Sequence, residues 1–201
     1  MTFLYGVFGI RKAILILQNL IINLTHRKRF GNSINVLGWP ILKFTKGSQV
    51  SIGKNLRLIS APYFSPPGVN HPVILSTTNA DAILNIGDDV GISGGGIVAA
   101  KEVIIGNNVL MGANVFITDT DFHPLASSNR RYSHEKIKIS PVRIGNNVFI
   151  GMDSIILKGV SIGDNSIVGA GSVVTHNIPE NSIAAGNPAK IISSIPGMRI
   201  T

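Results

Sequence analysis

The sequence predicts an all-β protein: a parallel β-helix of hexapeptide repeats with an N-terminal helical segment and one protruding loop. Between Ile144 and Ile191 an aliphatic residue recurs every six positions, and Gly follows it in four of six cases; the positions are Ile144, Ile150, Ile156, Ile162, Val168 and Val174. A period of six fits neither the 3.6-residue period of a helix nor the two-residue period of a strand. It fits triangular coils in which each side is one short strand.

The same spacing continues towards the N-terminus. Two further runs have the six-residue step, namely Ile86, Ile92 and Val98, and Ile105, Met111 and Ile117. The step from Val98 to Ile105 is seven, so we expect one coil to carry an extra residue there. Ile52-Gly53 is a candidate earlier hexad, and regular repeats are expected from Val73 to Thr118. The count is about five to six coils, above the roughly three repeats that a stable stack needs.

Turn chemistry accompanies the repeat. The pairs Asn107-Asn108, Asn146-Asn147 and Asp164-Asn165 each follow a repeat Gly, and these residue types suit corners with unusual backbone angles. We therefore interpret them as structural. The segment from Ser60 to Pro72 holds four Pro and is expected to be an irregular loop.

Length and composition bound the organisation of the chain. The 201 residues correspond to one β-helix domain over residues 31–193, a helical, basic segment over 1–30, a loop insertion over about 119–141 and a tail over 194–201. The sequence has no Cys, which excludes disulfides, thiolate nucleophiles and Cys-ligated zinc. This fits a reducing compartment, and we expect a cytoplasmic protein.

Positive charge gathers at the front of the chain. Of 18 Lys and Arg and 10 Asp and Glu, residues 1–80 hold nine basic and no acidic ones, which leaves nine basic and ten acidic residues for 81–201. The charges do not precede an apolar stretch as in a signal peptide, and the run from Ala13 to Leu24 is too short to span a bilayer. Two interpretations stay open: a helix that caps the β-helix, or an interfacial helix on the inner face of the cytoplasmic membrane. Nucleic-acid binding is disfavoured, because no aromatic residues interleave with the basic ones.

The main break in the repeat contains Asp119-Thr120-Asp121-Phe122-His123-Pro124. Loops that protrude from a rigid repeat scaffold often carry binding residues. An imidazole next to carboxylates can have its tautomer fixed by one of them while the other ring nitrogen takes a proton. We predict His123 as a general base, oriented by Asp121 or, as the weaker choice, Asp119. The remaining histidines are expected to be surface residues, and no metal site is expected.

Residues from about 73 to 193 resemble the hexapeptide-repeat acyltransferases, a group that includes maltose and galactoside O-acetyltransferases, Vat-type xenobiotic acetyltransferases and enzymes of polysaccharide clusters. The resemblance rests on IIGNNVLMGANVFITDTDFHPL and on VRIGNNVFIGMDSIILKGVSIGDNSIVGAGSVVTHNIPENSIAAGNPAKII. It implies a left-handed coil and a homotrimer that binds acetyl-CoA between neighbouring prisms. By position it assigns the coenzyme to Met152, Ala170, Thr175 and Lys190, and the acceptor to Ser93 and Asp119.

The resemblance also sets the functional hypotheses. The first is an acetyl-CoA-dependent O-acetyltransferase, without a required metal, that acts on a sugar or glycan hydroxyl in bacterial surface polysaccharide biosynthesis. A close alternative is N-acetylation of a nucleotide-linked amino sugar. An alternative from another class is a non-catalytic β-helix scaffold subunit.

Overall fold

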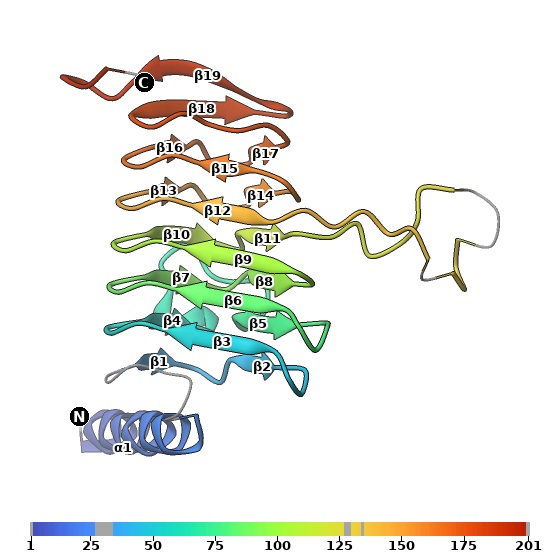
Figure 1. The fold of residues 1–201 in the computed structure, drawn as a ribbon. Helices are drawn as coiled ribbons and strands as arrows, with labels where there is room; N and C mark the ends of the chain where they lie inside the picture. The colour runs from blue at the N-terminus through green and yellow to red at the C-terminus, as the bar shows by residue number, and fades with distance from the viewer. Residues whose placement is uncertain (1, 27–33, 127–129, 134, 200–201) are drawn as a thin grey trace.

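The chain folds into a stack of triangular coils with a helix across one end (Figure 1). The structure is a computed structural model, and it describes residues 2–26, 34–126, 130–133 and 135–199. The three sides of the prism are three sheets. Within them the strands are parallel, apart from the antiparallel pair that ends the stack.

The eight-stranded sheet contains, in spatial order, β1 (Asn35–Leu37), β4 (Arg57–Ile59), β7 (Gly91–Ser93), β10 (Leu110–Ala113), β13 (Phe149–Ile150), β16 (Ile167–Val168), β18 (Ser182–Gly186) and β19 (Ala189–Ser194). The six-stranded sheet contains β17 (Val173–Val174), β14 (Ile155–Ile156), β11 (Phe116–Thr118), β8 (Gly96–Ala99), β5 (Ile74–Thr77) and β2 (Ile41–Lys43). The five-stranded sheet contains β15 (Ser161–Ile162), β12 (Val142–Ile144), β9 (Glu102–Ile105), β6 (Ile83–Ile86) and β3 (Gln49–Ile52).

Regular coils begin earlier than the sequence pattern suggested. The first coil is β1, β2 and β3, so the stack starts at Asn35 and not at Val73. In the described residues five coils are complete, and the third side of a sixth is reduced to the single bridge between Ile162 and Ile178. The Pro-rich segment lies between β4 and β5 and includes a short 3-10 helix, Pro62–Phe64.

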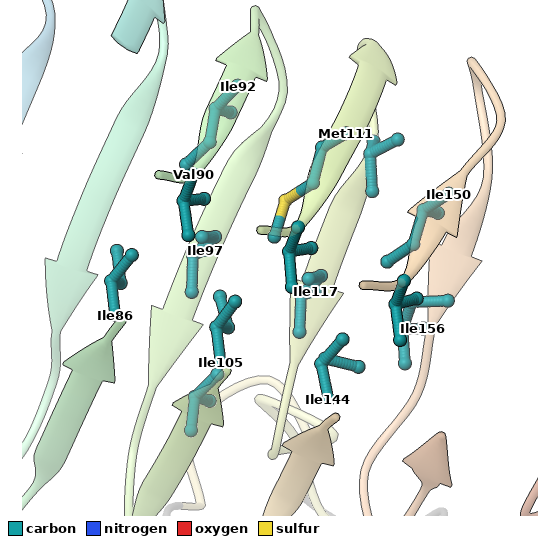
Figure 2. Packing of buried hydrophobic residues seen from close by; sticks show 14 of the residues in the cluster. Ile86, Val90, Ile92, Ile97, Ile105, Met111, Ile117, Ile144, Ile150 and Ile156 are labelled. Atoms are coloured by element: carbon teal, nitrogen blue, oxygen red, sulfur yellow. The ribbon is translucent and has the colours of Figure 1, made fainter. Parts of the chain in front are cut away.

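The repeat aliphatics form the core. Each sheet contributes a column of buried residues to the centre of the prism, as Figure 2 shows for ten labelled members of the cluster. Ile86, Ile105 and Ile144 stack in the five-stranded sheet, while Ile92, Met111 and Ile150 stack in the eight-stranded sheet. Stacking of like side chains explains why the sequence must repeat.

One predicted register position is wrong. In the six-stranded sheet Ile97, not Val98, pairs with Ile117 and is fully buried. Gly94 and Gly95 both have positive φ, and a Cβ on Gly95 would lie 2.1 Å from the carbonyl oxygen of Val115. This glycine pair turns the chain one residue early, so the steps are five and then eight in place of six and then seven.

The Asn pairs build one corner of the prism, as predicted. Asn108, Asn147 and Asn165 have left-handed backbones with φ of 56°, 56° and 61°. The residue before each caps the neighbouring coil: Asp88 N–H donates to Asn107 Oδ1 at 2.8 Å, and Asn107 N–H donates to Asn146 Oδ1 at 2.9 Å. The first residue of each pair therefore joins two coils, and the second makes the turn.

The N-terminal helix α1 (Thr2–Thr25) lies across the end of the prism next to β1 (Figure 1). Asn19 and Asn23, one turn apart on the same face, bond to the free edge of the first strand segment. Ile22 is buried among the core residues. Over the described part of the chain, no helix combines the length and apolar character required to cross a membrane.

Candidate functional site

The protruding loop leaves the prism at the corner after β11 and returns at β12 (Figure 1). Its two limbs are joined near the prism by the antiparallel bridge between Thr120 and Ile139. Asp121 N–H donates to the Lys138 carbonyl at 3.1 Å, and Ser140 N–H donates to the Asp119 carbonyl at 2.9 Å. The base of the loop is therefore an ordered two-stranded neck, which fixes the direction of the residues that follow.

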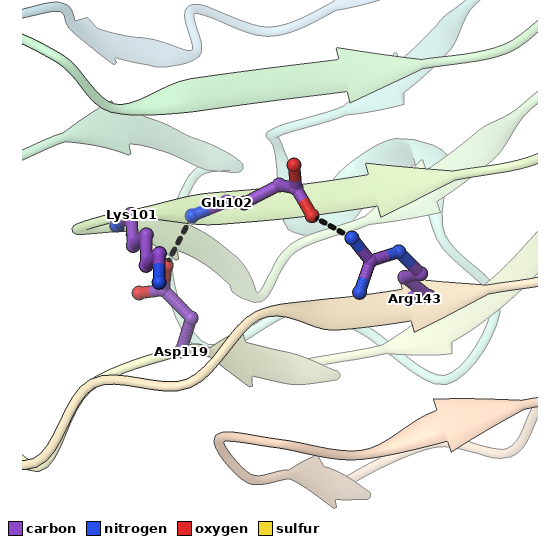
Figure 3. A network of polar contacts seen from close by, with 4 residues as sticks. All are labelled: Lys101, Glu102, Asp119 and Arg143. Atoms are coloured by element: carbon purple, nitrogen blue, oxygen red, sulfur yellow. Dashed lines mark hydrogen bonds and ion pairs between the residues drawn. The ribbon is translucent and has the colours of Figure 1, made fainter.

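Asp119 is a structural residue of this neck. Its side chain is completely buried, and its carboxylate accepts the backbone N–H groups of Ala100, Lys101 and Glu102, each at 2.7 Å. Ala100 and Lys101 lie at the long corner created by the eight-residue step, and Glu102 begins β9. Figure 3 shows Lys101, Glu102 and Asp119 together with the Glu102–Arg143 ion pair. Asp119 therefore has no exposed atom for an acceptor, and its predicted role in substrate binding is corrected to the capping of this corner.

His123 projects from the next turn. The preceding residue, Phe122, has a φ of 61°, a conformation that an aromatic residue rarely adopts. His123 N–H donates to the Asp121 carbonyl at 2.7 Å, and the side chain of His123 is exposed. Within the described residues its imidazole makes no hydrogen bond. Unusual backbone geometry of this kind gathers at functional sites, where the surrounding structure holds it in place.

The Asp121 carboxylate points to a different partner from the one predicted. Its Oδ1 lies 2.6 Å from Nζ of Lys158, and its buried Oδ2 has no hydrogen bond within the described residues. Lys158 follows β14 on the next coil. Among the residues that the structure describes, the Asp121 carboxylate makes no hydrogen bond to the imidazole, and Asp121 instead joins the turn before His123 to the prism.

A cavity of about 470 Å³ lies beside this turn. Thr120 and Phe122 line it from the loop, and the remaining lining residues are Thr78, Asn79, Ala100, Lys136, Ile137 and Ile139. Both limbs of the loop and two successive corners of the prism thus contribute to one hollow. Sequence reasoning missed this lining because its members are far apart in the chain; the only local signal was the aromatic residue directly before His123.

The residues assigned to the coenzyme and the acceptor fall into two groups. Ser93, Met152 and Ala170 stack at the corner between the eight-stranded and six-stranded sheets: Ser93 pairs with Ala113, and Gly171 N–H donates to the Met152 carbonyl at 2.8 Å. A Cβ on Gly151 would come within 2.4 Å of the Ala170 nitrogen, so the coils approach closely here. This corner presents Met152, 36% exposed, and an exposed Ala170.

Thr175 lies at the opposite edge of the six-stranded sheet, directly after β17 and two coils above the loop. Its exposed hydroxyl bonds to Nδ1 of His176 at 2.8 Å. Lys190 is exposed in β19, opposite Ala185 of β18. At about 3.3 Å per strand residue, the corner that holds Met152 and the corner that holds Thr175 lie on the order of 15 Å apart across the six-stranded sheet. One chain by itself does not bring His123 and Met152 together.

The outer faces of the prism differ in polarity. The six-stranded sheet turns apolar side chains outward, namely Ile41, Ile74, Phe116, Ile155 and Val173, and the eight-stranded sheet does so with Leu110, Phe149, Ile167 and Ile183. Leu110 is 56% exposed and Phe149 is 42% exposed. The five-stranded sheet is more polar outside, with Gln49, Ser51 and the Glu102–Arg143 pair. Two of the three faces are thus suited to further contacts.

Comparison with known proteins agrees with this architecture. A family model described as the hexapeptide repeat of succinyl-transferase matches residues 102–119 and 141–176, the two segments on either side of the loop. Over these two segments the chain carries the hexapeptide repeat that this family model describes. The predicted resemblance to that family, and with it the all-β, left-handed parallel β-helix, is confirmed.

Curated relatives match about half of the chain. The galactoside O-acetyltransferase of Escherichia coli K12 is 45% identical over 102 residues, which are 49% of this chain and 47% of the relative. The protein named "Putative lipopolysaccharide biosynthesis O-acetyl transferase WbbJ" from the same strain is 39% identical over 102 residues, 48% of this chain and 52% of the relative. The chain thus spans about half the length of the curated relatives it matches.

A solved structure extends the comparison of the fold. It is a hexapeptide-repeat acetyltransferase from Vibrio cholerae, complexed with acetyl-CoA, which is 24% identical to this chain with a TM-score of 0.53. The alignment covers 75% of this chain and 72% of that one. This likeness shows the fold.

Proposed function

We propose that the protein is an acetyl-CoA-dependent O-acetyltransferase that acts on a sugar or glycan hydroxyl, with His123 as the general base. The observation that carries the proposal is the exposed imidazole of His123 on a left-handed turn beside the cavity of about 470 Å³. The O-acetyltransferase names of the two Escherichia coli relatives support an acyl transfer to oxygen. The name of the second also supports a role in surface polysaccharide biosynthesis.

The proposed chemistry requires one base. A neutral imidazole of His123 takes the proton of the acceptor hydroxyl while that oxygen attacks the thioester carbonyl of acetyl-CoA. The tetrahedral intermediate collapses with cleavage of the carbon–sulfur bond, and the imidazolium returns the proton to the departing thiolate. The products are the acetyl ester and CoA. Because the chain has no Cys, direct transfer is simpler than a thioester intermediate on the enzyme.

Asp121 acts in this scheme through the backbone. Its carbonyl accepts the His123 N–H, and its carboxylate is paired with Lys158 on the neighbouring coil. It is therefore a positioning residue that holds the turn before His123. The sequence-based proposal that its carboxylate orients the imidazole is replaced by this arrangement.

The coenzyme is proposed to contact the residues that the resemblance assigns. Met152 and Ala170 offer a shallow apolar corner, Thr175 offers a hydroxyl at the other edge of the same sheet, and the exposed ammonium of Lys190 suits an anionic phosphate. Ser93, below Met152 on the same corner, is retained as the acceptor-side polar residue.

A homotrimer would complete the site. His123 and Met152 lie at opposite edges of the six-stranded sheet in one chain, whereas a neighbouring prism can place its corner opposite the loop. The apolar outer faces of two sheets support such packing, since their exposed aliphatic and aromatic side chains would leave water. We propose that the reaction occurs in the cytoplasm, between adjacent copies of the chain.

The test is acetyl-CoA binding by calorimetry, followed by thiol release over a panel of free sugars, nucleotide-linked amino sugars and glycan oligomers. Release with a hydroxyl acceptor supports the proposal, and His123→Ala should lower kcat by about 10²- to 10⁴-fold without a change in circular dichroism. Release only with an amino sugar would replace it by N-acetylation. A folded protein that does not bind acetyl-CoA would indicate a scaffold subunit.

A further inference from the structure

The N-terminal helix places polar as well as apolar side chains against the prism. A surface helix turns its apolar side toward the protein core. In α1 the side chains of Asn19 and Asn23 face the prism: each amide donates to a backbone carbonyl and accepts a backbone N–H, at Val36 and at Ile34 respectively. Gln18 is buried at the same junction. These polar contacts fix the rotation of the helix about its axis.

The opposite side of the helix is an apolar ridge. It consists of Ile14 (53% exposed), Ile16 (61%), Leu17 (57%), Leu20 (53%), Ile21 (39%) and Leu24 (63%). Monomeric soluble proteins rarely expose a contiguous apolar patch of this kind without a binding role. We define the six residues as the helix ridge.

Aromatic residues extend this surface. A hollow of about 350 Å³ lies between the helix and the first coils, and Ile14, Trp39, Tyr63 and Phe64 are among its lining residues. Trp39 is 55% exposed and Tyr63 is 69% exposed. Exposed Trp and Tyr are typical of the zone where a protein meets the headgroups of a bilayer. The end of the prism that carries the helix thus combines an apolar ridge with amphipathic rings.

The charge of the same end identifies the partner. Residues 1–80 contain nine Lys and Arg and no Asp or Glu. Of these, Lys43, Lys46, Lys54 and Arg57 are exposed on the first two coils, at the end of the prism that carries the helix. A second copy joined through the helix ridge would bring like charges together, whereas an anionic surface would neutralise them. Apolar side chains flanked by positive charge are the pattern of a helix that lies in the interface of an anionic bilayer.

We propose that α1 is an in-plane membrane helix that seats the prism, end first, on a bilayer containing anionic lipids. The helix lies across the axis of the prism (Figure 1), so its ridge can enter the headgroup region along its length. In this position the coils stand upright on the membrane. The proposal does not depend on the catalytic assignment.

Vesicle flotation of the full-length protein tests this inference. Vesicles contain either phosphatidylcholine alone or phosphatidylcholine with about one third phosphatidylglycerol or phosphatidylserine. We expect binding to both anionic compositions, at least tenfold weaker binding to phosphatidylcholine alone, and loss of binding as salt is raised. Leu17→Glu/Ile21→Glu should reduce binding at least tenfold. Ile192→Glu is the matched control at the other end of the stack, where Ile192 is 64% exposed, and should bind as the wild type does.

A charge variant and a check of folding complete the test of membrane binding. Lys43→Glu/Lys46→Glu leaves the ridge intact and should weaken binding to anionic vesicles severalfold, while circular dichroism checks that each variant folds. The proposal is overturned if the folded wild-type protein stays with the unbound fraction, or if the ridge variant binds as well as the wild type. It is also overturned if the ridge variant instead abolishes a lipid-independent self-association seen by sedimentation velocity. Thiol release with a water-soluble acceptor reports separately on the proposed activity.

Discussion

Asn19 and Val36 exchange two hydrogen bonds in the manner of paired strands. Val36 N–H donates to Asn19 Oδ1 at 2.7 Å, and Asn19 Nδ2 donates to the Val36 carbonyl at 2.9 Å. Asn23 repeats the arrangement one helical turn later at Ile34. Two side-chain amides thus cover the edge that β1 would otherwise present to solvent or to another chain, which is the usual hazard of an end strand.

Replacing Asn19 tests this cap. Asn19→Ala leaves the Val36 N–H and carbonyl without their partners, so we expect a loss of about 1–3 kcal/mol in the free energy of unfolding. Leu20→Ala, at the adjacent exposed position, is the control and should change it by less than about 0.5 kcal/mol. Urea denaturation followed by circular dichroism measures both. Equal effects of the two substitutions would show that the amide bonds contribute nothing to stability.

Asp119 is expected to affect stability more than acceptor binding. Asp119→Asn places an amide N–H₂ against at least one of the three backbone N–H groups that the carboxylate accepts, at Ala100, Lys101 and Glu102. We expect the free energy of unfolding to fall by about 2 kcal/mol or more, with little change in the acceptor KM of the remaining folded enzyme. A raised KM at unchanged stability would restore the acceptor role predicted from the sequence.

Substitutions of Phe122 can distinguish the effect of backbone strain on stability from the effect of cavity shape on activity. Gly adopts the φ of 61° without steric cost, so Phe122→Gly should change the free energy of unfolding by less than about 1 kcal/mol. The same substitution removes one wall of the cavity beside His123, and we expect kcat/KM to fall roughly 2- to 10-fold. Thermal unfolding and thiol release measure the two effects. Phe122→Ala, which removes the ring but keeps the strain, should be the less stable of the two variants.

Lys158 should control the order of the loop neck. Both side chains of its ion pair with Asp121 are about three-quarters buried. Within the described residues Oδ2 of Asp121 has no hydrogen bond, and Lys158→Met would remove the partner of Oδ1 as well. We expect a loss of about 1 kcal/mol in local stability, which corresponds to roughly fivefold faster tryptic cleavage at the exposed Arg131. Lys46→Met, at an exposed position away from the loop, should leave this rate unchanged. An unchanged rate in Lys158→Met would mean that the pair does not hold the loop.

If the protein is a trimer, its assembly and its activity should both depend on the apolar outer faces of the prism. Ile155, 37% exposed, projects from β14, the second strand from one edge of the six-stranded sheet. Ile155→Glu should convert a trimer to monomers in light scattering and abolish transfer, because the charge would have to be buried without a partner. Gln49→Glu adds the same charge to the polar five-stranded sheet and should keep both assembly and activity. A wild-type protein that is monomeric and active would refute the shared site.

The sequence by itself determined the architecture. The six-residue spacing of residues such as Ile144 and Ile150, and the Asn pairs at the corners, predict triangular coils because each local signal acts within one coil. It also indicated the loop and singled out His123, since a long break in a short repeat is visible without any knowledge of distant contacts. The resemblance to hexapeptide-repeat acyltransferases followed from the same local motifs.

Only the tertiary structure decided where Ile97, Asp119, Asp121 and the helix ridge point. Ile97 takes the register position predicted for Val98 because the Gly94-Gly95 turn is short. The Asp119 carboxylate accepts hydrogen bonds from N–H groups of the preceding coil. The carboxylate of Asp121 goes to Lys158 and not to the imidazole. The outward direction of the helix ridge depends on Asn19 reaching Val36 across 17 residues. Each depends on a local backbone turn or on a contact with a distant part of the chain, and a spacing pattern along the sequence does not contain that information.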